Sequence, residues 1–161
     1  MRKMTTFRFA ERADTARILD FIRALAEYER MSDDVVADEA TLEHWIFDQG
    51  KAEVLFALED NREVGFALFF HNFSTFLGRA GIYLEDLFVL PAYRGRGHGK
   101  ALLTELARIA VDRGCGRLEW SCLDWNKPSI DFYLSMGAQQ MNGWTGYRIA
   151  GQRLADMGRR E

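Results

Sequence analysis

A glycine-rich stretch near the middle of the chain constrains the fold more than any other part of the sequence. Between Arg94 and Lys100, glycines alternate with basic or polar residues, after an apolar segment and before a strongly periodic one. Glycine allows backbone conformations that other residues avoid, and the first N–H groups of a helix lack partners within it. Because the helix dipole also favours an anion at this end, the stretch predicts a phosphate-binding loop between a strand and a helix.

Three kinds of phosphate loop can be compared with this stretch. A Walker A loop requires GxxxxGK followed by Ser or Thr, but here alanine follows the Gly-Lys pair and arginine stands at the first glycine position. A dinucleotide fingerprint requires GxGxxG, and its last glycine is missing whether the pattern starts at Gly95 or at Gly97. The pattern Arg/Gln-x-x-Gly-x-Gly/Ala is met by Arg94, Gly97 and Gly99.

This third pattern resembles the acetyl-CoA pyrophosphate loop of the GNAT superfamily of N-acetyltransferases. The alternative interpretation is a glycine-rich connection that binds nothing. The apolar run Leu87–Tyr93 before the loop and the amphipathic helix expected over 101–113 after it favour the acetyltransferase. Further segments are similar to the diamine N-acetyltransferases, a group that includes the spermidine/spermine and thialysine enzymes: 22–29, 82–89 and 125–133.

The resemblance implies an α/β fold of the GNAT type: a mixed, mostly antiparallel sheet, two central parallel strands that splay apart, and flanking helices. Apolar periodicity along the chain predicts elements that agree with this fold. Asp14 and Asp38 are expected to cap the first two helices, and Asp60-Asn61-Arg62 to close a hairpin. The expected helices are 14–29, 38–46, 101–113 and 126–136, and the expected strands are 6–9, 53–59, 63–73, 81–89, 117–123, 138–141 and 144–150.

Composition narrows the remaining possibilities. The length of 161 residues and the 48% of hydrophobic residues predict a single domain, residues 1–161. The 21 basic and 24 acidic residues give a net charge of −3, which argues against general nucleic-acid binding. No apolar run is long enough for a membrane span, and the start is not signal-like. Cys115 and Cys122 form no CxxC pair, so we expect reduced thiols, no metal site and a cytoplasmic location.

The resemblance also implies which residues contact the acetyl-CoA cosubstrate. Its pantetheine arm is expected to pair with the backbone of the first splayed strand, and its pyrophosphate to lie on the glycine loop. The start of a later helix is expected to flank it from the other side. The implied residues are Leu87, Phe88, Val89, Arg94, Gly95, Arg96, Gly97, His98, Gly99, Lys100, Asn126, Lys127, Pro128 and Ser129.

The implied reaction is acetyl transfer from a thioester to a primary amine by direct attack. An alkylammonium has a pKa near ~10.4, so a base or a water relay has to remove its proton at neutral pH. Tyr133 lies where the family has its general acid, and Glu85 where it has a substrate-side glutamate. Asp86 points to the opposite face of an ideal strand and is expected to matter less. A covalent route through Cys122 is not favoured, because the sequence shows no base at a spacing that would activate this thiol.

The substrate class is suggested by charge and by the resemblance together. The segment 27–39 has six acidic residues and one basic residue, which suits a cationic substrate unless it is only a solvated surface. A diamine or polyamine is therefore the leading substrate. Thialysine, lysine or another small amine, a protein amine, and a CoA-binding sensor without catalysis are the alternatives. The residues implied to contact the amine are Tyr28, Glu29, Glu85, Glu119, Trp120 and Ser121.

The expected partners follow from the same resemblance. The substrate is a small molecule, and neither nucleic acid nor a membrane is expected as a partner. Family members pair through their C-terminal strands, so the segment 144–149 predicts a homodimer.

Overall fold

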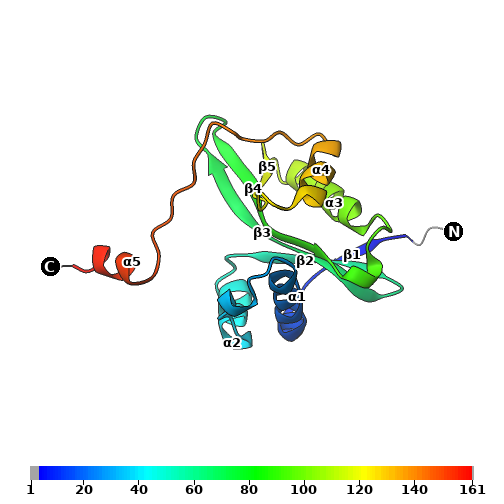
Figure 1. The fold of residues 1–161 in the computed structure, drawn as a ribbon, viewed down its shortest axis with the longest axis horizontal. Helices are drawn as coiled ribbons and strands as arrows, with labels where there is room; N and C mark the ends of the chain where they lie inside the picture. The colour runs from blue at the N-terminus through cyan, green and yellow to red at the C-terminus, as the bar shows by residue number, and fades with distance from the viewer. Residues whose placement is uncertain (1–3, 161) are drawn as a thin grey trace. The chain divides into compact units, whose positions relative to one another are not determined.

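The structure, a computed structural model, describes residues 4–160. The chain consists of two compact units, Met1–Ser121 and Cys122–Glu161. The first unit contains a five-stranded sheet in the order β1-β2-β3-β4-β5, antiparallel except for the parallel pair β4 and β5 (Figure 1). Its strands are β1 Thr6–Phe9, β2 Glu53–Glu59, β3 Arg62–Ser74, β4 Arg79–Val89 and β5 Leu118–Trp120.

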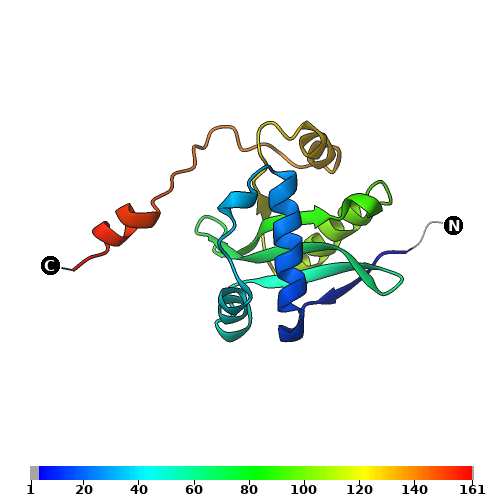
Figure 2. The ribbon, with the colours of Figure 1, turned by 60° about the horizontal axis from the view of Figure 1, so that its bottom comes forward.

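Helices cover both faces of this sheet. Figures 1 and 2 show α1 (Thr15–Tyr28) and α2 (Glu39–Leu42) on one face and α3 (His98–Asp112) on the other. After α2 the chain continues as a π-helical segment, Glu43–Asp48. Short 3₁₀ turns lie at Arg12–Asp14, Ser32–Asp34 and Pro91–Tyr93.

The core between α1 and the sheet is aromatic. Phe21 of α1 is fully buried, and its ring centroid lies 5.1 Å from that of Phe66 and 5.8 Å from that of Phe56. Burying each such ring removes a large apolar surface from water, which stabilises the packing of α1 on the sheet. The same cluster includes Phe88 of β4, so the strand that precedes the glycine loop is anchored in this core.

The hairpin between β2 and β3 is confirmed. Glu59 and Arg62 pair directly, and the two residues between them, Asp60 and Asn61, have φ values of 49° and 61°. Two consecutive left-handed residues make a turn whose twist matches that of antiparallel strands, and Asp and Asn tolerate this conformation better than most residues.

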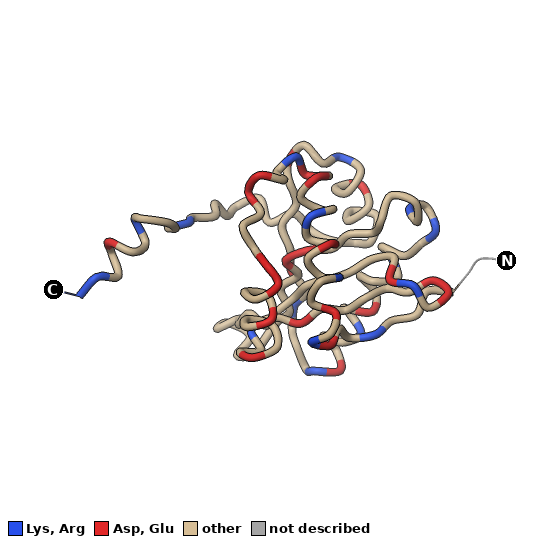
Figure 3. The backbone as a smooth tube through the Cα atoms, turned by 90° about the horizontal axis from the view of Figure 1, so that it is seen from below, with Lys and Arg blue, Asp and Glu red and all other residues tan. Residues whose placement is uncertain are grey.

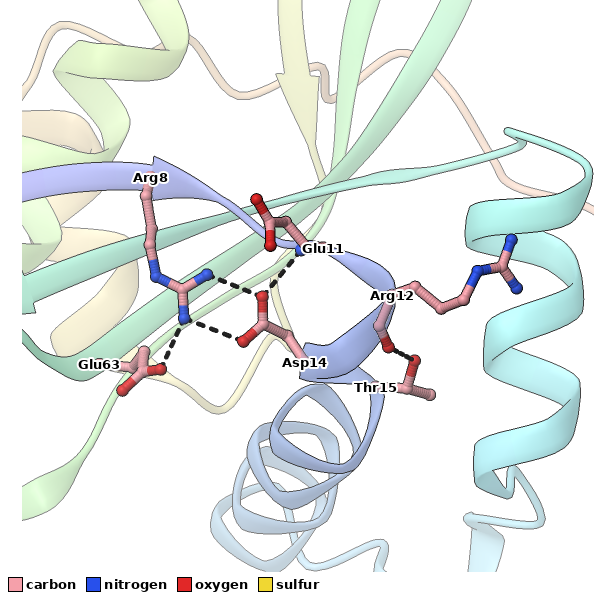
Figure 4. Close-up of polar contacts among 6 residues, drawn as sticks. All are labelled: Arg8, Glu11, Arg12, Asp14, Thr15 and Glu63. Carbon is pink, nitrogen blue, oxygen red and sulfur yellow. Dashed lines mark hydrogen bonds and ion pairs between the residues drawn. The ribbon is translucent and has the colours of Figure 1, made fainter.

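The expected cap of α1 is only half right. Asp14 occupies the N-cap position, but its side chain makes no capping hydrogen bond to the helix. Its carboxylate instead accepts from the Arg8 guanidinium at 2.7 and 2.9 Å and from the Glu11 backbone N–H at 2.8 Å (Figure 4). Arg8 also donates to Glu63 at 2.7 Å. The Arg8 hydrogen bonds lower the pKa of Asp14, because they favour the ionised carboxylate.

The second unit differs most from expectation. Helix α4, Lys127–Ser135, is capped by Asn126, whose Oδ1 accepts from the Ser129 backbone N–H at 3.3 Å, as predicted. The strands predicted over 138–141 and 144–150 are wrong: within the described part of this unit these residues form neither strand nor helix, and α5, Gly151–Met157, follows. A strand is held by backbone hydrogen bonds to a neighbouring strand, and none of residues 122–160 takes part in such a ladder.

Candidate active site

The glycine loop has the backbone that an anion requires. Gly95 and Gly97 have φ values of 75° and 87°, in the left-handed region that favours glycine. Gly97 is the N-cap of α3, and the first helical bond runs from Ala101 N–H to its carbonyl at 3.0 Å. The N–H groups ahead of Ala101 therefore have no partner within the helix. A Cβ added at Gly95 would meet nothing within 4 Å, so the space over the loop is open to a ligand.

Basic side chains accompany this loop. Arg94 donates from Nε to the Val89 carbonyl at 3.1 Å, and its guanidinium carbon lies 4.8 Å from the ring centroid of Tyr28 and 5.1 Å from that of Phe88. Arg94 therefore connects the loop with the end of α1. The side chain of His98, by contrast, is buried, so only its backbone can contact an anion here.

A register shift in β4 decides which side chains face α1. Leu84 pairs with Phe69, but Asp86 pairs with the adjacent Leu68, so Glu85 is an extra residue in the ladder. Cross-strand partners share a face, and neighbours along a strand alternate. Leu84 and Asp86 therefore lie on opposite faces, although an ideal strand would put them on the same one. Leu68 packs on the core under α1, which assigns Asp86 to the α1 face.

The carboxylates of Glu29, Glu85 and Asp86 are close enough near the end of α1 for their charges to interact. Burial raises the pKa of Asp86 to about 7, with smaller contributions from the negative charges of Glu85 and Glu29. Burial also raises the pKa of Glu29, the C-cap residue of α1. Glu85 is exposed. The cluster thus combines the exposed carboxylate of Glu85 with the half-buried one of Asp86, which changes its charge near neutral pH.

The chain after α1 adds more negative charge. Between Glu27 and Glu39 it has six acidic residues and a single basic one, Arg30 (Figure 3 shows acidic positions in red). Asp33, Asp34 and Asp38 are exposed. Exposed charges of one sign raise the local concentration of an oppositely charged ligand, so this surface favours cations.

Residues 18–138 match the model of the Acetyltransferase (GNAT) family. The chain is a GNAT acetyltransferase. It is therefore an acetyl-CoA-dependent N-acetyltransferase, and the resemblance noted in its glycine loop is confirmed.

Relatives of this acetyltransferase align over nearly its whole length. The thialysine N-epsilon-acetyltransferase of Bos taurus is 38% identical over an alignment of 162 positions, which covers 93% of this chain and 95% of that protein. The spermidine/spermine N(1)-acetyltransferase-like protein 1 of Homo sapiens is 32% identical over an alignment of 161 positions, which covers 93% of this chain and 23% of that longer protein. A solved integron cassette protein from the mobile metagenome of V. cholerae has a TM-score of 0.80 at 27% identity over 99% of each chain. The expected α/β GNAT fold is confirmed.

The position of Asp86 on the α1 face could not be predicted from strand alternation. That argument assumes an unbroken two-residue period, and the extra residue at Glu85 breaks it. One signal was present in the sequence: two adjacent acidic residues stand inside an otherwise apolar strand. Burying two adjacent charges in an apolar strand costs free energy, so such a pair indicates either an irregular strand or a functional site.

The residues predicted on the second splayed strand have other partners. Glu119 Oε1 accepts from Asn72 Nδ2 at 3.1 Å and pairs with Arg117 Nε at 3.1 Å, and the Ser121 hydroxyl lies 2.9 Å from that of Tyr83. Trp120 pairs with Leu84, one register position further along β5 than Glu119, and so faces the other side of the sheet. Their assignment to the amine site stays a prediction.

β4 and β5 pair only from Ile82 to Leu84 on the β4 side, so β4 continues without this neighbour toward the glycine loop.

The remaining predicted residues belong to the second unit. Tyr133 lies on α4, and its ring centroid is 5.4 Å from that of Phe132. Lys127 Nζ pairs with the carboxylate of Asp131 at 2.8 and 3.0 Å, and Pro128 occupies the first turn of the helix. The roles of Tyr133, Asn126, Lys127 and Ser129 toward acetyl-CoA stay predictions.

Among residues 4–160, no group of three or more His, Cys, Asp and Glu side chains is placed to hold a metal ion. No helix in this part of the chain is long and apolar enough to cross a membrane.

Proposed function

We propose that this acetyltransferase acetylates a primary amine of a small cationic substrate, with a diamine or polyamine as the leading class. The observation that carries this proposal is the carboxylate cluster of Glu29, Glu85 and Asp86 beside a glycine loop of the acetyl-CoA type. An ammonium group is attracted by such a cluster, and a second amino group on the same substrate can meet the acidic surface that follows α1.

Asp86 is suited to take the proton of the reacting amine. Transfer from an ammonium of pKa about 10.4 to a carboxylate of ordinary pKa is uphill by about 6.5 units, or about 9 kcal/mol. Transfer to Asp86, whose pKa is about 7, is uphill by about 3.4 units, or about 4.6 kcal/mol. The burial that raises the pKa of Asp86 therefore makes it the better proton acceptor. Glu85, which is exposed, can bind the ammonium or pass the proton through water.

Acetyl-CoA supplies the activated acetyl group. In the proposed arrangement, the backbone N–H groups from Gly95 to Lys100 hold its pyrophosphate, with Arg94 and Arg96 as nearby positive charges. The edge of β4 at Leu87, Phe88 and Val89 lies beyond the β5 pairing, and its backbone would hydrogen-bond the extended arm of the cosubstrate. Tyr133 would protonate the departing thiolate, and the start of α4, Asn126–Ser129, would flank the cosubstrate. These last two roles rest on the family resemblance.

A second candidate substrate is thialysine or a related amino acid with a side-chain amine. The observation that favours it is the 38% identity with the thialysine N-epsilon-acetyltransferase of Bos taurus over 93% of this chain. The proposed chemistry is unchanged, but the other end of the substrate then has an α-amino and an α-carboxylate group in place of a second amine.

CoA release from acetyl-CoA, measured against a panel of amines, tests the proposal. The panel contains putrescine, spermidine, spermine, thialysine, lysine and a basic peptide. Highest kcat/KM on the polyamines supports the leading class, and highest kcat/KM on thialysine or lysine supports the second. Acetyl-CoA binding without turnover on any of these amines contradicts the proposed substrate class.

Two further expectations belong with this function. A homodimer is expected from the family, and the hydrophobic residues Trp144, Tyr147 and Ile149 are exposed in the single chain. A cytoplasmic location would match small metabolic substrates. Sedimentation equilibrium of the purified chain tests the first of these predictions.

A further inference from the structure

Glu59, the last residue of β2, is a buried carboxylate that contacts the glycine loop. Only 5% of its surface is exposed. Its Oε2 accepts a hydrogen bond from Arg96 Nη1 at 2.8 Å, and its Oε1 lies 3.3 Å from His98 Nε2. One carboxylate therefore holds the two residues on either side of Gly97.

A chain of hydrogen bonds continues behind the loop. His98 is 1% exposed, and its Nδ1 lies 2.8 Å from the Thr5 hydroxyl. An ionised carboxylate can only accept, so the hydrogen between His98 and Glu59 is on His98 Nε2. In the neutral imidazole, Nδ1 then accepts from Thr5. Thr5, just before β1, is in this way linked through His98 and Glu59 to Arg96.

Electrostatics alone does not explain a carboxylate at this place. Burial by itself would raise the pKa of Glu59, but the hydrogen bonds from Arg96 and His98 and the positive charge of Arg96 outweigh it and hold the pKa below its usual range. Glu59 is therefore a negative charge beside a loop that has to bind an anion. Coulomb repulsion makes this charge unfavourable for the anion, so another benefit has to offset it.

The benefit is geometric. Gly97 keeps a left-handed φ of 87° as the N-cap of α3, and the direction of the first helical N–H groups depends on that conformation. Arg96 is an exposed side chain with many rotamers, and fixing it before the ligand arrives reduces the entropy lost on binding. The aromatic ring of Tyr93 supports the same placement, with the Arg96 guanidinium carbon 5.1 Å from its centroid.

We propose that Glu59 is a positioning residue for acetyl-CoA binding, which acts by fixing Arg96 and His98 on both sides of Gly97. This inference rests on the proposed function, in which the loop holds the pyrophosphate. Because Glu59 is buried against Arg96 and His98, the proposal gives it no direct contact with the cosubstrate or the amine, so its substitution should change the affinity for acetyl-CoA and leave the chemical step almost unchanged.

Two substitutions separate position from charge. Glu59→Asp keeps the negative charge but shortens the side chain by one methylene, so the carboxylate no longer reaches both partners in the same geometry. Glu59→Gln keeps the length but removes the charge and turns one acceptor into a donor. Positioning predicts a loss of affinity in both variants, whereas a role of charge alone predicts no change for Asp and tighter binding for Gln.

A matched control exists at the other end of the same two elements. Glu53, the first residue of β2, pairs with Arg113, which follows α3, at 2.6 and 2.9 Å. Glu53→Gln removes an ion pair between the same strand and the residue that follows the same helix, at the ends of both elements that lie away from the loop. It reports the effect of weakening the β2–α3 connection in general.

Steady-state kinetics and calorimetric titration with CoA measure the outcome. We expect the KM for acetyl-CoA to rise about tenfold or more in both Glu59 variants, with kcat within about threefold of the wild-type value and Glu53→Gln close to wild type. An unchanged KM in Glu59→Asp, a lowered KM in Glu59→Gln, or an equal rise in Glu53→Gln overturns the inference. Circular dichroism melting identifies a variant that fails to fold, and Glu59→Asp, the smaller change, then decides.

Gly97→Asp separates this inference from the function on which it rests. If Gly97→Asp abolishes CoA binding while both Glu59 variants bind normally, the loop binds the cosubstrate and Glu59 has no positioning role. If Gly97→Asp also binds CoA normally, the proposed role of the loop is itself wrong.

Discussion

Replacing Asp86 by asparagine should make this acetyltransferase more stable at pH 8 and much less active. The pKa of Asp86 is raised from its ordinary value of 3.8 to about 7, first by burial and then by the charges of Glu85 and Glu29. Above pH 7 the folded protein therefore contains a half-buried, partly desolvated negative charge that the unfolded chain exposes fully to water. Asparagine has nearly the same shape and no charge, so it removes this cost together with the proposed proton acceptor.

The sign and size of the effect follow from proton linkage. Below about pH 4 both the folded and the unfolded chain bind the proton, and above about pH 7 neither does. Between these values only the folded chain binds it, so wild-type stability falls as pH rises. The window spans about three pH units at about 1.36 kcal/mol each, which gives at most about 4 kcal/mol. Between pH 4 and pH 8, the free energy of unfolding of Asp86→Asn should therefore increase by this amount relative to that of the wild type.

Urea unfolding of both proteins at intervals between pH 4 and pH 8.5 measures this difference. Titrations common to both proteins cancel in the comparison, so the two curves should diverge by about 1.4 kcal/mol per pH unit within the window. Glu85→Gln is the control, because it removes an exposed charge from the next residue. It should move the upper end of the window to lower pH and leave its slope unchanged. Parallel curves for Asp86→Asn and wild type would refute the assignment of a raised pKa to Asp86.

Three further substitutions test other parts of the molecule. Tyr133→Phe should lower kcat by about 10–10³-fold in the CoA-release assay with little change in acetyl-CoA affinity, and an unchanged kcat would exclude an acid role. Gly97→Ala places a Cβ at a φ of 87° and should destabilise the loop by about 1–2 kcal/mol, which weakened CoA binding in calorimetry would reveal. Phe21→Ala removes a fully buried ring between Phe56 and Phe66 and should lower the free energy of unfolding by about 3–5 kcal/mol in urea, and a smaller loss would mean that the cavity collapses.

Local signals explain which predictions were right. The hairpin at Asp60 and Asn61 depends on two residues that tolerate left-handed backbone, and the start of α4 depends on Asn126 and a following proline. In both cases the physical cause lies within four residues of its effect. The glycine loop belongs to the same class, since its conformation depends on the absence of side chains at Gly95 and Gly97.

Longer-range interactions explain the errors. Asp14 was expected to cap α1, but Arg8 of a neighbouring strand takes its carboxylate. Short strands were also expected over 138–141 and 144–150, on the local sequence alone. Propensity cannot supply a partner for the backbone hydrogen bonds, and the second unit has no strand among its described residues.

The sequence by itself determined the family of the protein. A glycine loop between a strand and an amphipathic helix was enough to indicate a GNAT acetyltransferase. It could do so because the loop pattern is local and its chemistry is that of the backbone. Only the tertiary structure decided that Asp86, rather than Glu85 alone, belongs with Glu29, and that Glu59 lies beneath Arg96 and His98. A one-residue shift between two strands reverses the face of every later side chain, and a partly buried ion pair joins residues 37 positions apart. Both depend on how distant segments pack, which no local pattern encodes.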